Sequence, residues 1–171
     1  MNNIPTKINR YNVYNEAEKL IGIGEETPLP DFESMTETLS GAGILGEIDD
    51  PAIGHFSNME MEIPFRMLDK ENTNFLDMTK AVKLTLRGAQ QATSSEGNIV
   101  FRNMRVVVRG RTTKLSPGKV KAGAPMETSV TISLTYILIE VDGETLVELD
   151  KLNQVFKIGG RDILEKVREM C

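Results

Sequence analysis

The chain has 171 residues, of which 40% are hydrophobic and 26% are charged, and its formal net charge is −5. A chain of this length buries about two thirds of its unfolded surface, so we expect a single domain, residues 1–171, with a sizeable core. Tryptophan is absent and aromatic residues make up only 5%, which leaves few rings to stack on nucleic-acid bases or to line a sugar-binding cleft.

Alternating apolar and polar side chains predict β-strands in the first half of the chain. Short strands are expected at residues 11–14 and 18–23, and a strand with one solvent-facing side is expected at residues 59–63. A short helix is predicted within residues 64–78, and the alternation resumes at residues 82–86. The chain contains 12 valines, 14 isoleucines and 14 threonines, and such β-branched residues favour pleated, half-buried surfaces.

Two longer strands are expected in the second half, at residues 100–108 and 130–141. The latter alternates at first and then becomes apolar on its second face too, so we expect it to be buried on one side and then on both. Asp142-Gly143 follows directly and suits the positive φ angles of a type I′ turn. Residues 146–149 should therefore return as the second strand of a hairpin.

The carboxyl end is predicted to hold a strand at residues 154–158 and, after Gly159-Gly160, a flanking helix with aliphatic residues at helical spacing. Two segments rich in proline and glycine, residues 25–51 and 112–127, show no such pattern and are predicted to be irregular and extended. The sequence therefore indicates a mainly β fold with long loops and little helix.

Charge is distributed unevenly along the chain. Residues 1–62 contain 3 basic and 12 acidic residues, whereas residues 63–171 contain 17 basic and 13 acidic ones. Residues 99–121 carry seven basic side chains and no acid. This basic stretch has two interpretations: it pairs with the acidic first third of a neighbouring subunit, or it is a hairpin on a nucleic-acid-binding β-barrel. A single accompanying aromatic residue, Phe101, makes the protein contact the better explanation.

Motifs for catalysis or cofactor binding are incomplete. Residues 41–46 spell G-x-G-x-x-G, but no strand precedes the glycines and no helix follows them, so dinucleotide binding is not expected. His55 is the only histidine and Cys171 the only cysteine, which excludes an intrachain disulfide and a zinc site made of several such ligands. A hydrolase that uses carboxylates alone is a distant alternative. We therefore expect no enzyme activity, no metal and no cofactor.

Short motifs in a fixed order resemble the major tail tube protein of contractile-tailed bacteriophages, a family that also supplies the tubes of R-type bacteriocins. The resemblance covers about residues 37–63 and 99–169. The residues that carry it are Leu39-Ser40-Gly41-Ala42-Gly43 with Gly46, Arg109-Gly110-Arg111, Tyr136, Asp142-Gly143, Leu146-Val147-Glu148-Leu149-Asp150, Asn153, Gly160, Asp162 and Leu164.

This resemblance implies a β-sandwich or barrel-like tail tube fold with a carboxyl-terminal flanking helix. It also implies hexameric rings that stack head to tail into a hollow tube inside a contractile sheath, a conduit for DNA in a phage or for ions in a bacteriocin. The implied partners are further copies of the chain, the sheath protein, the tape-measure protein, the baseplate and terminator proteins, and transient DNA in the lumen. No catalysis and no cofactor are implied.

The implied location is a virion tail or a bacteriocin particle, made and assembled in the bacterial cytoplasm. The amino terminus agrees with that location, because it lacks the basic flank and apolar stretch of a secretory signal. No apolar run approaches the roughly 20 residues that span a bilayer, so membrane insertion by this chain is not expected.

Opposite charges on one chain suit head-to-tail stacking of subunits. The residues predicted at subunit and ring interfaces are Gly41, Gly43, Glu47, Asp49, Asp50, Arg109, Arg111, Lys114, Lys119 and Lys121. A conduit for DNA should repel phosphate, so acidic side chains on strands with a polar face, namely Glu18, Glu60 and Glu62, are the candidates for the lumen wall.

Overall fold

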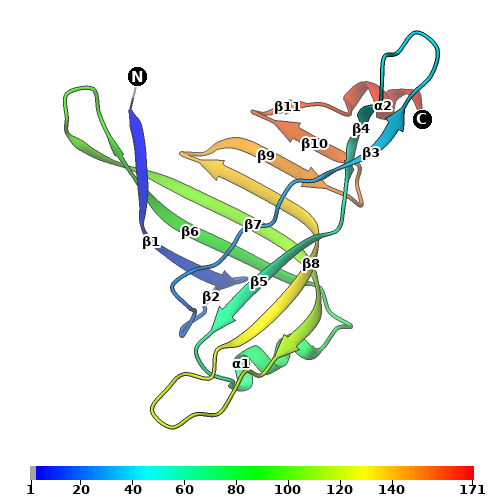
Figure 1. Ribbon diagram of the computed structural model, residues 1–171. Helices are drawn as coiled ribbons and strands as arrows, with labels where there is room; N and C mark the ends of the chain where they lie inside the picture. The colour runs from blue at the N-terminus through cyan, green and yellow to red at the C-terminus, as the bar shows by residue number, and fades with distance from the viewer. Residues whose placement is uncertain (1–2) are drawn as a thin grey trace.

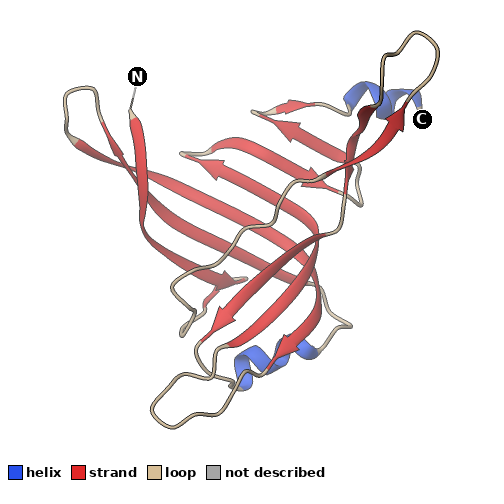
Figure 2. Ribbon diagram, viewed as in Figure 1, coloured by secondary structure: helices blue, strands red, loops and turns tan. Residues whose placement is uncertain are grey.

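A computed structural model describes residues 3–171 and is dominated by antiparallel β-strands (Figures 1 and 2). The mainly β class predicted from the sequence is therefore confirmed. The strands are β1 (Ile4–Asn15), β2 (Glu18–Lys19), β3 (Ser34–Leu39), β4 (Ile48–Phe56), β5 (Met59–Phe65), β6 (Val82–Thr93), β7 (Ile99–Ser116), β8 (Thr128–Val141), β9 (Glu144–Asp150), β10 (Val155–Ile158) and β11 (Arg161–Asp162), and the helical segments are α1 (Lys70–Thr73), η1 (Asn74–Leu76) and α2 (Glu165–Met170).

One large sheet has the strand order β11-β10-β9-β8-β7-β6-β1-β2, and β5 pairs with the first half of β8. The chain after β2 closes this sheet onto itself. Ile23 bridges Phe65 of β5, and the amide of Gly24 donates to the Pro64 carbonyl. Hydrogen bonds thus run in a closed, barrel-like circuit, while β9, β10 and β11 extend away from it as a wing (Figure 1).

The core lies inside the closed part of the sheet. Inward-facing residues alternate along β5, where Met59, Met61 and Ile63 are almost fully buried while Glu60 and Glu62 are exposed. Leu84 on β6 and Val108 on β7 are buried by the same period-2 rule. Below this core, α1 begins with a capping box at Asp69, and η1 places Phe75 against Phe65.

The expectation that β8 is buried on both faces along its second half is wrong. Buried residues occupy even positions up to Leu134, and the next buried position is Ile137. The pairing with β7 explains this change, because Gly110 faces Leu134 whereas Arg109 faces Tyr136, so Thr135 is an extra residue in β8. A β-bulge of this kind moves the following residues to the opposite face.

The segment 25–51 is not irregular throughout. Residues 34–56 form a two-stranded sheet, β3 with β4, that pairs with no strand of the large sheet. We call residues 34–56 the arm, and Figure 1 shows it projecting from one end of the molecule. Its strands lack the buried positions that make a strand recognisable in a sequence. The segment 112–127 also differs from expectation, because β7 continues to Ser116 before the loop begins.

The other expected elements are present with shifted bounds. The first strand is much longer than residues 11–14, since β1 begins at Ile4. The stretch 18–23 forms only the short β2 and the bridge at Ile23. Asp142 and Gly143 both have positive φ, as predicted for the hairpin turn, and the expected carboxyl-terminal helix is α2.

The close approach of β7 and β8 beside the bulge depends on Gly110. A Cβ at this position would lie closer to the Ser133 carbonyl oxygen than any van der Waals contact allows. We therefore predict that Gly110→Ala lowers the free energy of unfolding by about 1–3 kcal/mol, as overpacking does, measured by urea denaturation. Gly88→Ala on β6 is the matched control, because its Cβ meets only ordinary contacts. Equal stability of the two variants would contradict this prediction.

Candidate assembly surfaces

The arm exposes both polar and apolar side chains. Met35, Leu45, Ile48 and Ile53 are all more than half exposed, and Leu45 at the tip is fully exposed. Residues 34–56 contain four carboxylates and no lysine or arginine. An isolated two-stranded sheet is marginally stable in water, and clustered exposed apolar side chains mark interaction sites. The arm therefore has the composition of a surface that binds a partner.

The predicted interface residues of the first half all lie on this arm. Gly41 and Gly43 form its tip with positive φ, and a Cβ on either would meet no atom within 4 Å. Glu47, Asp49 and Asp50 lie directly before or within β4 and are exposed. The side chain of Asp49 accepts a hydrogen bond from the Thr38 hydroxyl across the hairpin.

The base of the arm packs on the wing of the large sheet. The Phe56 ring lies edge-on to Phe32, with centroids 5.9 Å apart, and edge-on to Phe156 of β10, with centroids 5.1 Å apart. Lys151 donates a hydrogen bond from Nζ to the Ser57 carbonyl oxygen. Partial burial lowers the pKa of this lysine. These contacts hold the base in place and leave the rest of the arm extended into solvent.

Several arginines of the basic stretch form ion pairs within the chain. Arg105 binds Glu140 of β8 through Nε and Nη2, at 2.7 and 2.6 Å from Oε2. Arg102 lies 4.0 Å from Asp142 at the hairpin turn. Cross-strand pairs of opposite charge stabilise a sheet. Much of the positive charge of residues 99–121 is therefore balanced inside the fold.

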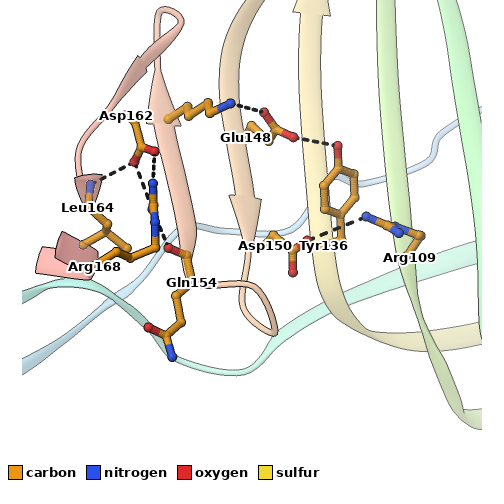
Figure 3. Close-up of polar contacts among 9 residues, drawn as sticks. Arg109, Tyr136, Glu148, Asp150, Gln154, Asp162, Leu164 and Arg168 are labelled. Carbon is orange, nitrogen blue, oxygen red and sulfur yellow. Dashed lines mark hydrogen bonds and ion pairs between the residues drawn. The ribbon is translucent and has the colours of Figure 1, made fainter. Parts of the chain in front are cut away.

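Arg109 takes part in a polar network across four strands (Figure 3). Its guanidinium stacks on the Tyr136 ring, 4.0 Å from the centroid, and lies 3.8 Å from Asp150 of β9. The Tyr136 hydroxyl donates to Glu148, which also pairs with Lys157 of β10. Stacking of a cation on an aromatic ring stabilises such a site. The structure thus places Arg109 in the connection between barrel and wing.

Two pKa values in this network are shifted. Burial and the hydrogen bond to Glu148 raise the pKa of Tyr136 to about 12. Burial would raise the pKa of Asp150, but hydrogen bonds from Asn153 and Leu152 and the charge of Arg109 outweigh it, so this pKa lies below its usual value. Tyr136 is thus held protonated and Asp150 ionised, as their contacts require.

The remaining predicted interface residues lie on β7 and in the loop that follows it. Arg111 and Lys114 are exposed on β7, opposite Ser133 and Thr131 of β8. Lys119 and Lys121 lie in the loop between β7 and β8, at the end opposite the arm (Figure 1). We call residues 117–127 the basic loop. The Thr128 hydroxyl donates a hydrogen bond to the Pro117 carbonyl oxygen, and the amide of Met126 donates one to the Arg66 carbonyl oxygen. These two bonds anchor the base of the loop. Lys119 lies 3.5 Å from Glu127, although both side chains are 70% exposed.

The three lumen candidates are exposed on outer strand faces. Glu18 lies on β2 at the closure of the sheet, and Glu60 and Glu62 lie on the outer face of β5. Glu60 and Glu62 therefore share one strand face, whereas Glu18 lies on a different strand. Asn58 donates to Glu60, which fixes one carboxylate at this face.

No metal centre is formed by the described part of the chain. Within residues 3–171, no three His, Cys, Asp or Glu side chains are arranged to hold a metal ion. The same residues contain no helix with the length and hydropathy needed to span a membrane.

Comparison with known protein sequences places the chain in a family. The family described as phage tail tube protein FII matches residues 5–170. This chain belongs to that family. It is 27% identical to the tail tube protein of Escherichia phage P2 over 173 residues, which cover 96% of each chain. It is also 37% identical to the major tail tube protein of Serratia phage KSP20 over 60 residues, 35% of each chain.

Membership of the tail tube family means that this chain is a structural component of a phage tail.

The residues that sequence reasoning missed are those whose partners come from other strands. Tyr136 is recognisable as a strand residue, but its place beside Arg109 depends on the register between β7 and β8. The packing of Phe32, Phe56 and Phe156 likewise joins three distant segments.

The polar network around Tyr136 makes the free energy of unfolding of this tail tube protein depend on pH in the alkaline range. Tyr136 has a folded pKa of about 12 against about 10 when unfolded. Its contribution is therefore complete below pH 10 and is lost as the pH rises through 12. We expect the tyrosinate absorbance of the folded wild type to include one titration near pH 12 that Tyr136→Phe lacks. A variant that instead removes a titration near pH 10 would contradict the prediction.

Proposed function

We propose that this chain is the inner-tube subunit of a contractile tail, in which hexameric rings stack head to tail into a hollow conduit. The observation that supports the proposal best is the placement of two complementary features. The acidic, apolar arm projects at one end of the molecule and the basic loop lies at the other (Figure 1). A surface at one end that fits the opposite end of another copy forms a heterologous contact, which generates rings or filaments.

The arm supplies an apolar contribution to such a contact. Its exposed methionine, leucine and isoleucine side chains gain free energy when a neighbour covers them, at about 25 cal/mol per Å² of apolar area. Gly41 and Gly43 at the tip carry no side chain, so another backbone can approach these two residues closely.

The acidic group Glu47, Asp49 and Asp50 supplies the electrostatic contribution. We assign Lys119 and Lys121 of a second copy, together with Arg111 and Lys114, as its partners, since all four cations are exposed and the first two lie in the basic loop at the opposite end. The ion pair of Lys119 with Glu127 is exposed on both sides, and such surface pairs contribute little. Exchange of Glu127 for a carboxylate of the neighbouring arm therefore costs little free energy.

The finer parts of the proposal concern the assembled tail. The tube lies inside a contractile sheath and is bounded by the tape-measure, baseplate and terminator proteins. It conducts DNA in a phage or ions in a bacteriocin. Glu18, Glu60 and Glu62 line the lumen, where their charge repels phosphate. Assembly takes place in the bacterial cytoplasm.

The structure gives less support to nucleic-acid binding by residues 99–121. A phosphate-binding surface needs cations that are free to replace counterions. Arg102, Arg105 and Arg109 instead pair with carboxylates of the same chain. The exposed Phe101 is the only aromatic residue in this stretch, so a stacking platform for bases is also lacking.

Electron microscopy of the concentrated, purified protein tests the proposed function. We expect stacked rings or hollow rods with a six-fold end view. A protein that stays monomeric at high concentration and in low salt, and instead binds DNA with a steep salt dependence, would contradict the tube and support the alternative.

The stacking contact is tested by charge reversal. We predict that Lys119→Glu with Lys121→Glu reduces rod formation at least about tenfold, because like charges would then face each other. The monomer should stay folded, because exposed charges contribute little to its stability. The measurement is rod mass in sedimented samples, with circular dichroism as the check on folding.

Two comparisons make this test specific. Glu96→Lys, in the exposed turn between β6 and β7, is the control and should leave rod formation intact. Reversal of Glu47, Asp49 and Asp50 to lysine in the doubly reversed protein should restore part of it. Rods of normal number and salt tolerance in the Lys119→Glu, Lys121→Glu variant would exclude the basic loop as an interface.

A further inference from the structure

The pairing register of β3 and β4, the two strands of the arm, shifts at one place. Ser34 pairs with Phe56 and Thr36 pairs with Pro51, so Met35 alone lies opposite the four residues Ala52–His55 of β4. We call Ala52–His55 the hinge. A large bulge interrupts the ladder and bends the strand. The hinge thus separates the distal arm, residues 36–51, from the base that packs on the wing.

Gly54 in the hinge is in contact with the carboxyl-terminal segment. Its φ is +77°, and a Cβ at this position would lie 2.7 Å from Cδ1 and 2.9 Å from Cδ2 of Leu164. Leu164 is only 9% exposed, although β4, the strand that contains Gly54, is otherwise mostly exposed. The absence of a side chain at Gly54 is therefore what allows Leu164 to sit against the hinge.

Leu164 is itself fixed by polar contacts (Figure 3). Its amide donates to Oδ1 of Asp162, and Arg168 on α2 binds the same carboxylate. Arg168 also donates to the Gln154 carbonyl oxygen, at 2.8 Å. The hydrogen bonds from Arg168 hold the pKa of Asp162 below its usual value. A short segment on the wing therefore presents one apolar side chain to the hinge.

The distal arm has few other supports. Every residue from 36 to 51 is exposed, and its pairing partners are the two strands of the arm itself. The hinge and the side chains that contact the hinge therefore determine the direction in which the distal arm points.

We propose that Leu164 is a latch that sets the direction of the arm in a single copy, before any neighbour is present. The latch goes beyond the proposed tube, since all of its contacts lie within one chain. Its benefit to any partner binding is that an arm held in one direction loses less conformational entropy when it docks. Removal of the Leu164 side chain leaves the hinge bend intact and frees the distal arm to swing.

The experiment measures the arm direction in isolated copies. Spin labels are placed at Leu45→Cys on the arm tip and Glu96→Cys on the turn between β6 and β7, in a Cys171→Ser background. Labelled protein is diluted into unlabelled protein, so that distances within one copy are measured in any assembly state. We expect one narrow distance distribution for the otherwise wild-type chain and a broad one for Leu164→Ala.

Val167→Ala is the matched control, because Val167 lies on α2, three residues after Leu164, but is 52% exposed. Its distribution should stay narrow. Gly54→Ala approaches the latch from the other side: its Cβ displaces Leu164 and strains the backbone at φ +77°, so the distribution should broaden although Leu164 is present. Leu164→Val, which shortens the same side chain without touching the hinge backbone, decides the question if Leu164→Ala does not fold.

Two results would overturn the latch. One is a distribution for Leu164→Ala or Gly54→Ala that is as narrow as that of the parent. The other is a parent distribution that is already broad. Rod formation by the same variants is a separate measurement: failure of the parent protein to form rods would count against the proposed tube, and the distance distributions would still decide the latch.

Discussion

Closure of the large sheet by residues 22–24 is the constraint on which the rest of the structure depends. Ile23 forms a β-bridge with Phe65, and the Gly24 amide donates a hydrogen bond to the Pro64 carbonyl oxygen. Because of these contacts, β5 and the strands β1, β6, β7 and β8 enclose one core. Residues 25–57 connect Gly24 to β5, and their strands β3 and β4 pair with no strand of this circuit. They form the arm, a hairpin that the fold anchors at its base but does not cover.

The two kinds of charge in this protein have different uses. Arginines of β7 pair with carboxylates on neighbouring strands and join the barrel to the wing, as Arg105 does with Glu140. Lysines of the basic loop and carboxylates of the arm are exposed at opposite ends. Charges of the first kind stabilise one copy, and those of the second kind are suited to contact between copies.

The sequence predicts the elements whose side chains alternate against the core, such as β5 and β6, and the turn at Asp142-Gly143. It does not predict the arm, because strands exposed on both faces have no periodic pattern. The bulge at Thr135 escapes prediction for another reason: an extra residue is visible only in the register with β7. The contact of Arg109 with the Tyr136 ring depends on the same register.

We propose that another copy of the chain completes the arm. Hydrogen exchange of the amides in residues 36–51, compared between isolated copies and assembled rods, measures this contact. We expect fast exchange of these amides in isolated copies and strong protection in rods, while the barrel strands β6 and β7 are protected in both. Equal exchange of the arm amides in the two states would contradict it.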